Sequence, residues 1–181
     1  MAELASYEQI DDRDDDRPLQ QFLSFELGKE SYAVEILSVE EIKSDETLTR
    51  LPRTPPWVKG VLNLRGTIVP VIDLRERFDI EAPAAVRAEV IIILIVKAGD
   101  QQRRVGAIVD DVTDVLPLGE DEIEAAPDLG SAISTEFIRG IATLEDSVVL
   151  LLDVDRLFSP DELSKMADVE SNADEDDGEE N

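Results

Sequence analysis

The stretch PWVKGVLNLRGTIVPVIDLRERF, Pro56 to Phe78, contains two apolar runs that meet at the pair Arg65-Gly66. Apolar runs on both sides of a two-residue turn are typical of a β-hairpin. Glycine fits the second place of such a turn, because it adopts a positive φ without a Cβ clash. The stretch therefore predicts a hairpin with Arg65 at its tip, but the turn does not explain the arginine.

The same pattern occurs a second time, 80 residues further along the chain. The run VKGVLNLRGTIVPVIDLRERF (58–78) aligns without a gap on IRGIATLEDSVVLLLDVDRLF (138–158). A second match, at an offset of 73, aligns YAVEILSVEEI (32–42) with VGAIVDDVTDV (105–115). Two matches in the same order indicate two copies of one strand-rich unit, at about 22–78 and 90–158.

The two copies differ at the tip of the hairpin. The place of Arg65 and Gly66 is taken by Glu145 and Asp146 in the second copy, so the turn does not require an arginine. Arginine is well suited to a bidentate or stacked contact with a partner. The residues alone leave two interpretations of Arg65 open, a contact residue and a solvated turn residue.

The rest of the chain is also rich in strand signals. Short β-branched runs such as FLSFEL, YAVEIL, VIIILIV and SVVLLLDV alternate with polar turns. Helical signals are few, and the clearest is Ser159-Pro160-Asp161-Glu162, a capping box with proline at the first helical position. The fold class is therefore all-β, as small barrels or a sandwich, with short helices including one at the C-terminus.

Composition excludes several classes of function. The chain has no Cys and no His, so disulfides, Cys/His zinc sites and Ser-His or Cys-His nucleophile pairs are ruled out. The longest apolar run, Val90 to Val96, is far below the roughly 20 residues that cross a bilayer, and no secretory signal is visible. A net charge of −26 argues against nucleic acid and anionic membranes as partners.

The acidic charge divides the chain into three parts. Residues 1–19 hold seven acids and two Arg (−5), and residues 161–181 hold ten acids and one Lys (−9), which leaves −12 for residues 20–160. We expect an acidic disordered segment at 1–19, the folded domain at 20–160, and a short helix followed by a disordered tail at 161–181. The acidic domain suggests a halophilic source as a hypothesis.

Paired carboxylates are the one catalytic possibility that composition allows. Asp73 and Asp153 occupy equivalent strand ends, and Glu41 and Asp114 are equivalent in the other match. Such pairs could act as acid and base in a hydrolase, but aspartate at a strand end more often caps the next turn. The chain has no phosphate-binding loop, and the calcium-like run DEDDG lacks its closing Glu, so we expect no cofactor and no metal.

From Gln20 to Phe158, the chain closely resembles the CheW family of chemotaxis coupling proteins. Four stretches in family order carry the resemblance: FLSFELGKESYAVEILSVEEI, LPRTPPWVKGVLNLRGTIVPVIDLRERF, VGAIVDDVTDVLPL and STEFIRGIATLEDSVVLLLDVDRLF. The resemblance implies two SH3-like five-stranded β-barrel subdomains packed together. It also implies a non-enzymatic adaptor, cytoplasmic and associated with receptor arrays.

The partners implied are the cytoplasmic tip of methyl-accepting chemoreceptors and the regulatory domain of the histidine kinase CheA. By motif, Arg65 matches an arginine implicated in coupling and Glu41 a functional acid near a receptor-binding groove. Val39 and Ile42 flank Glu41 and are further candidates for the groove, and Gly60 and Gly66 match glycines expected to set backbone geometry. A CheW-type module of a two-component pathway other than taxis is the alternative.

Overall fold

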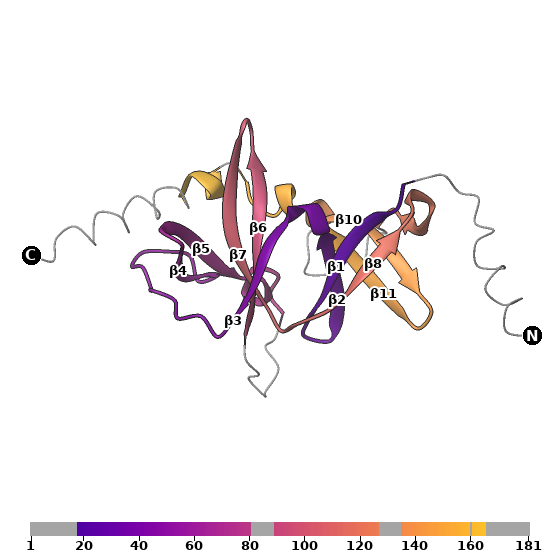
Figure 1. Cartoon of the computed structure of the whole chain (residues 1–181), viewed down its shortest axis with the longest axis horizontal. Coiled ribbons are helices and arrows are strands. Elements are labelled where there is room, and N and C mark those ends of the chain that lie inside the picture. The colour runs from indigo at the N-terminus through magenta and orange to yellow at the C-terminus, as the bar shows by residue number, and fades with distance from the viewer. Residues whose placement is uncertain (1–17, 81–88, 127–134, 160, 166–181) are drawn as a thin grey trace, which may run out of the picture.

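The computed structural model of the chain describes residues 18–80, 89–126, 135–159 and 161–165. Its strands form two sheets that lie next to each other along the long axis (Figure 1). One sheet, with the order β8-β1-β2-β11-β10-β9, builds what we call the terminal subdomain, and the other, with the order β3-β6-β7-β5-β4, builds the central subdomain. The expected all-β fold with two subdomains is confirmed.

The elements have the following bounds. The terminal subdomain contains β1 (Gln20–Leu27), β2 (Glu30–Glu35), β8 (Asp111–Leu118), β9 (Ile123–Glu124), β10 (Ile138–Leu144) and β11 (Ser147–Leu152). The central subdomain contains β3 (Val39–Ser44), β4 (Val58–Leu64), β5 (Thr67–Asp73), β6 (Val90–Ala98) and β7 (Gln101–Val109). The short helices are η1 (Ile36–Ser38), α2 (Leu74–Arg77), η2 (Glu120–Glu122), η3 (Thr135–Phe137) and η4 (Val154–Arg156), followed by a helical turn at 161–165.

The terminal sheet has one strand more than the five expected. This strand, β9, is only two residues long and pairs with Ile141 and Ala142 of β10. The central subdomain makes the equivalent contact as a single bridge, between Thr49 and Val61. The sixth strand is therefore a slight extension of a contact that both subdomains make.

Apolar side chains of the described residues form three clusters. One lies inside the central subdomain (Leu62, Leu64, Val69, Val71, Ile91, Ile93, Ile108) and one inside the terminal subdomain (Phe22, Ala33, Leu118, Ala142, Val149, Leu151). The third, which we call the seam cluster, joins both subdomains, with Leu23, Phe25 and Tyr32 from one and Ile92, Leu94 and Phe78 from the other among its members. Because it draws on both sheets, its burial fixes the subdomains against each other.

The strand β6 contributes to two clusters at once. Its residues Ile91 and Ile93 face the interior of the central subdomain, whereas Ile92 and Leu94 face the seam cluster. Successive side chains of a strand point to opposite faces, so a strand buried on both faces must be apolar throughout. This accounts for the continuous run VIIILIV.

Within the described residues, neither repeat forms a sheet of its own. The hairpin β1-β2 of the first repeat pairs with β8 and β11 of the second, while the hairpin β6-β7 of the second repeat pairs with β3 and β5 of the first. The chain passes between the subdomains at residues 36–38 and again at Asp110. Each subdomain is thus completed by strands from the other repeat, as the interleaved colours of Figure 1 show.

Local geometry is nevertheless the same in both copies. Parallel pairing joins Val71 to Gly106 in one subdomain and Leu151 to Ala33 in the other, which are equivalent positions. Both long hairpins also shift register at their motif glycine, Gly60 or Gly140. The internal pseudo-symmetry therefore extends to the hydrogen-bond register.

The expected C-terminal helix begins after Ser159. The Glu162 N–H donates to Ser159 Oγ at 3.1 Å, and the Ser159 N–H donates to Glu162 Oε1 at 3.5 Å. These two reciprocal contacts form the capping box that the sequence predicted. Leu163 is 5% exposed and belongs to the seam cluster, so the helix packs onto the shared core.

Tyr32 lies fully buried in the seam cluster. Its ring stacks between Phe25 and Phe78, with centroid distances of 6.1 and 6.0 Å, and its hydroxyl donates to Glu30 Oε2 at 2.7 Å. Burial, with a further contribution from Glu30, raises the pKa of Tyr32 well above its usual range. The folded chain therefore keeps this proton at pH values where the unfolded chain loses it.

We predict that stability falls at alkaline pH through Tyr32. Its contribution is complete below about pH 10, where both states hold the proton, and is lost as the pH rises above that value. Above about pH 10.5, the free energy of unfolding should fall by about 1.4 kcal/mol per pH unit more in the wild type than in Tyr32→Phe. Denaturant unfolding at pH 8 to 11.5 measures both slopes, and equal slopes would contradict the assignment.

Candidate functional site

The hairpin tip of β4-β5 has an unusual backbone. Arg65 and Gly66 both have positive φ, 51° and 87°, as in a type I′ turn, and the Gly66 N–H donates to Asn63 Oδ1 at 2.8 Å. A side chain in the left-handed region costs roughly 1–2 kcal/mol, a cost that glycine avoids. Neither Glu145 nor Asp146, at the equivalent tip, has a positive φ. Arg65 is thus held in a strained conformation that the second copy does without.

The Arg65 side chain forms an ion pair with Glu41 on β3. The Arg65 Nη2 atom donates to Glu41 Oε2, and Lys43 Nζ lies 3.4 Å from Glu41 Oε1. The Arg65 side chain is 75% exposed, and exposed ion pairs stabilise a fold by no more than about 1 kcal/mol. The structure therefore brings together Arg65 and Glu41, and the pair offers too little stability to explain the strained arginine.

Strand β3 presents Val39 and Ile42 on the side of the seam cluster. They lie opposite Leu94 and Ile92, which belong to that cluster, because a register shift between Val39 and Glu41 turns both side chains to the same face. Val39 is half-buried and Ile42 is 45% exposed.

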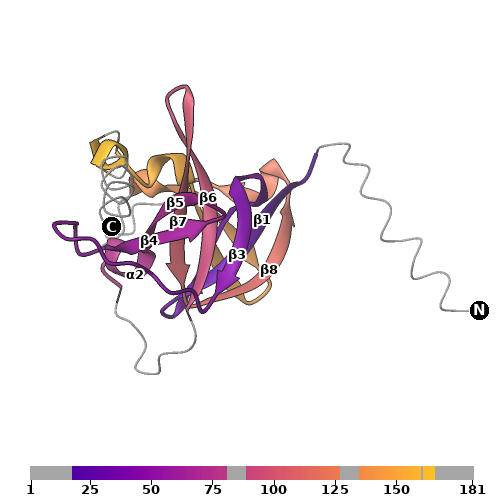
Figure 2. The same ribbon diagram turned by 60° about the vertical axis from the view of Figure 1, so that its left-hand side comes forward.

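Strand β8 repeats this arrangement in the terminal subdomain. Val112 and Val115 lie opposite Phe25 and Leu23 of the seam cluster, across a register shift at the equivalent place. Val115 is 42% exposed. Strands β3 and β8 lie on the same face of the molecule in Figure 1 and in Figure 2. We call the four residues Val39, Ile42, Val112 and Val115 the seam surface.

The two motif glycines, Gly60 and Gly66, have different surroundings. Gly60 has φ 149°, and a Cβ atom there would clash with the Thr49 carbonyl oxygen across the bridge to β4. Its equivalent Gly140 meets the Glu124 carbonyl oxygen in the same way. Gly66 has open space around it and is needed only for its positive φ. Gly60 therefore permits close backbone approach, while Gly66 permits the turn.

A partly buried ionic cluster between the subdomains was not predicted from the sequence. Arg75, at 12% side-chain exposure, donates to both carboxylate oxygens of Asp73 and to Asp110 Oδ1, all at 3.0 Å. Asp110 Oδ2 in turn accepts from the Gly28 N–H at 2.7 Å, in the terminal subdomain. The hydrogen bond to Asp73 raises the pKa of Arg75 above its already high usual range. One sequence difference could have pointed to this cluster, because the second copy has Asp155 at the position equivalent to Arg75.

The carboxylates of Asp73 and Asp153 each accept a hydrogen bond from the backbone of the turn that follows them. Asp73 Oδ1 accepts from the Arg75 N–H at 2.9 Å, and Asp153 Oδ1 accepts from the Asp155 N–H at 3.1 Å. Both residues are helix N-caps, a common role for aspartate. Within the described residues, no group of three or more acidic side chains is placed to hold a metal ion, and the run DEDDG lies outside them. This geometry favours the capping interpretation over a hydrolase.

No helix in the described part of the chain is long and apolar enough to span a membrane.

Comparison with known proteins gives a consistent result. A family model described as CheW-like domain matches residues 21–162. The chain is 39% identical over 150 residues to Chemotaxis protein CheW of Klebsiella aerogenes, covering 83% of this chain and 88% of that protein. It is 34% identical over 131 residues to Chemotaxis protein CheW of Bacillus subtilis, covering 72% and 81%.

A solved structure agrees with these relatives. The scaffolding protein TtCheW from Thermoanaerobacter tengcongensis superimposes with a TM-score of 0.70 at 35% sequence identity. The match covers 78% of this chain and 93% of that one.

Proposed function

Because the chain belongs to the CheW family and is therefore a non-catalytic chemotaxis scaffold, we propose that it binds its two partners through separate surfaces. The cytoplasmic tip of a methyl-accepting chemoreceptor binds the seam surface, next to Arg65 and Glu41. The regulatory domain of a CheA-type histidine kinase binds elsewhere on the molecule. Through both contacts the kinase comes under receptor control.

The conformation and exposure of Arg65 are the main support for this proposal. Its backbone is strained, its side chain is 75% exposed, and its ion pair with Glu41 adds little stability. Strained residues that the surrounding fold maintains are often part of a functional contact. Contact with a partner accounts for an arginine here in a way that the turn and the fold do not.

The seam surface supports a helix as the receptor element. Val39, Ile42, Val112 and Val115 offer apolar contacts from two neighbouring strand edges, beside the polar pair Arg65 and Glu41. An amphipathic helix binds such a surface with its apolar stripe, while charged groups at the rim fix its register. The weak Arg65–Glu41 pair leaves both side chains able to exchange partners when a helix arrives.

This assignment also gives the place of action. Receptor tips of this class lie on the cytoplasmic side of the membrane, and the chain would join them in signalling arrays without entering the bilayer. Its acidic surface is consistent with binding through the receptor protein and not through anionic lipid headgroups.

Co-sedimentation tests this function against the alternative of a non-taxis pathway. The full chain is mixed with membranes that contain a methyl-accepting chemoreceptor, with and without purified CheA, and pelleted. We expect the chain in the pellet with receptor membranes, and CheA in the pellet only when the chain is present. Membranes without receptor are the control. If the chain stays in the supernatant in both mixtures, it serves a different pathway.

A further inference from the structure

From the two repeats we infer that the seam surface binds its helix in one direction, with the basic end of the helix over the terminal subdomain and the acidic end over the central subdomain. The inference rests on the proposed function, which supplies a helix as the occupant. It adds the charge pattern that the helix must have and the residues that select it.

The apolar part of the seam surface is nearly symmetric. Val39 and Ile42 on β3 correspond to Val112 and Val115 on β8, and the exposures of Ile42 and Val115 are 45% and 42%. Both strands shift register at the equivalent residue, so the side chains point alike. Apolar contacts alone would therefore accept a helix in either direction.

The charged positions beside this surface are not symmetric. The positions are those of the hairpin tip and of the edge strand of each sheet, which the Arg65–Glu41 ion pair joins in the central subdomain. They hold Arg65, Gly66, Glu41 and Lys43 in the central subdomain and Glu145, Asp146, Asp114 and Leu116 in the terminal subdomain. Two cations and one anion give +1 at the first end, and three anions give −3 at the second.

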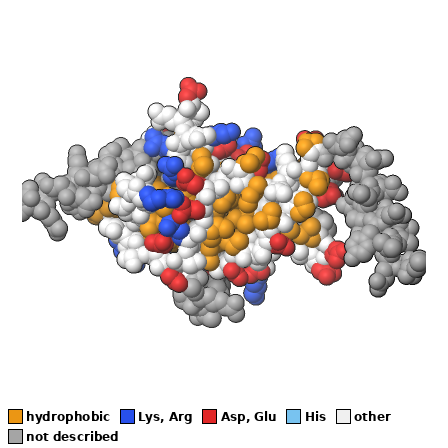
Figure 3. Space-filling view, in the orientation of Figure 1, with side chains coloured by type: hydrophobic (Ala, Val, Ile, Leu, Met, Phe, Trp, Pro, Cys, Tyr) orange, Lys and Arg blue, Asp and Glu red, His pale blue; other side chains and the backbone are white. Residues whose placement is uncertain are grey.

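The same difference is visible on the surface. Figure 3 shows a band of apolar side chains across the face that carries β3 and β8. Lys and Arg gather beside the central-subdomain end of the band, whereas the charged side chains in view at its right-hand end are red. Arg65 and Glu145 are both exposed, so both ends are open to a partner.

Charge complementarity then selects the direction of the helix. A basic end placed over Glu145 and Asp114 is attracted, and the reversed helix would place acidic side chains against these carboxylates. The positive N-terminal end of the helix macrodipole adds to the preference when the basic residues lie near the N-terminus. A preference of at least about tenfold corresponds to only about 1.4 kcal/mol.

The two repeats supply matched reporter positions for a test. Thr67 and Ser147 are exposed, equivalent residues next to the two tips, and the natural chain has no cysteine. Thr67→Cys and Ser147→Cys each give the full chain one thiol. The probe is a synthetic 21-residue amphipathic helix, roughly 30 Å long, with a basic N-terminal half, an acidic C-terminal half and one cysteine at its basic end.

Disulfide trapping under mild oxidation reads out the direction. We expect at least about tenfold more cross-linking to Ser147→Cys than to Thr67→Cys, and the reverse for a probe with its cysteine at the acidic end. Exchanging the charges, with Arg65→Glu combined with Asp114→Lys and Glu145→Lys, should reverse the preference.

Equal cross-linking at both sites, or no cross-linking at either, would overturn the inference. So would a preference that the charge exchange leaves unchanged. Co-sedimentation with receptor membranes decides the proposed function separately, since it does not depend on the direction of the helix.

Discussion

Replacing Arg75 with methionine is expected to lower the free energy of unfolding by about 3–5 kcal/mol. The substitution keeps most of the side-chain volume but leaves the buried carboxylate of Asp73 and the partly buried carboxylate of Asp110 without their cation. Removing one member of a buried ionic cluster is costly because the remaining charges stay in a site of low polarity. Asp110 also accepts a hydrogen bond from the Gly28 N–H, so the change should weaken the contact between the subdomains.

Arg156→Met is a matched control for this prediction. Arg156 pairs with Asp153, the equivalent of Asp73, at 3.5 Å, but its side chain is 70% exposed. Its replacement should change the free energy of unfolding by less than about 1 kcal/mol. Denaturant unfolding of the three proteins measures both effects. A loss below about 1 kcal/mol for Arg75→Met as well would show that the cluster contributes nothing beyond surface charge.

Much of the fold could be predicted from the sequence because each strand carries its own signal. The run VIIILIV indicated a strand, and the capping box at Ser159 indicated the C-terminal helix. The exchange of strands between the repeats could not be predicted from the repeat pattern. The same apolar alternation satisfies a hairpin that pairs within its repeat or with the other one. The exchange takes place at the crossings at 36–38 and Asp110, and Asp110 is held there by hydrogen bonds with Glu26 and Gly28 that the repeat pattern does not encode.

Only part of the candidate site could be predicted from the sequence, for similar reasons. Arg65 stood out because the second copy places Glu145 at the same tip, and Glu41 was carried by the family resemblance. Their pairing could not be read from the chain, since it depends on how the central sheet curves to bring a hairpin tip to β3. The register shifts at Glu40 and Thr113, which align the seam surface, leave no sequence signal of their own.

Arg65→Glu is expected to abolish receptor control of the kinase while leaving the fold intact. The substitution removes the exposed cation next to the seam surface and places a second acid beside Glu41. Repulsion between like charges and the lost arginine contact should weaken receptor binding by at least about tenfold. Stability should change by less than about 1 kcal/mol, because the ion pair is exposed.

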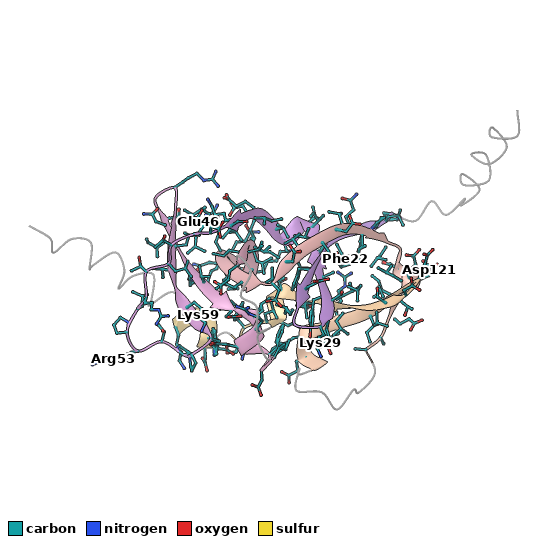
Figure 4. All side chains as sticks on the ribbon, turned by 90° about the horizontal axis from the view of Figure 1, so that it is seen from below. Phe22, Lys29, Glu46, Arg53, Lys59 and Asp121 are labelled. Carbon is teal, nitrogen blue, oxygen red and sulfur yellow. The ribbon has the colours of Figure 1, made fainter. Side chains whose placement is uncertain are left out.

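Arg53→Glu provides the matched control. Arg53 is also an exposed arginine with a positive φ, 63°, but it lies in the loop between β3 and β4, as Figure 4 shows. The two variants make the same change in net charge and in side chain. A difference in kinase control between the two variants is therefore due to the position of the substituted arginine.

CheA autophosphorylation in reconstituted receptor membranes, measured with wild type, Arg65→Glu and Arg53→Glu, tests whether Arg65 contacts the receptor. We expect the receptor ligand to change kinase activity with wild type and with Arg53→Glu, and this response to be lost with folded Arg65→Glu. An undiminished response with Arg65→Glu would contradict the assignment of Arg65 and the seam surface to the receptor.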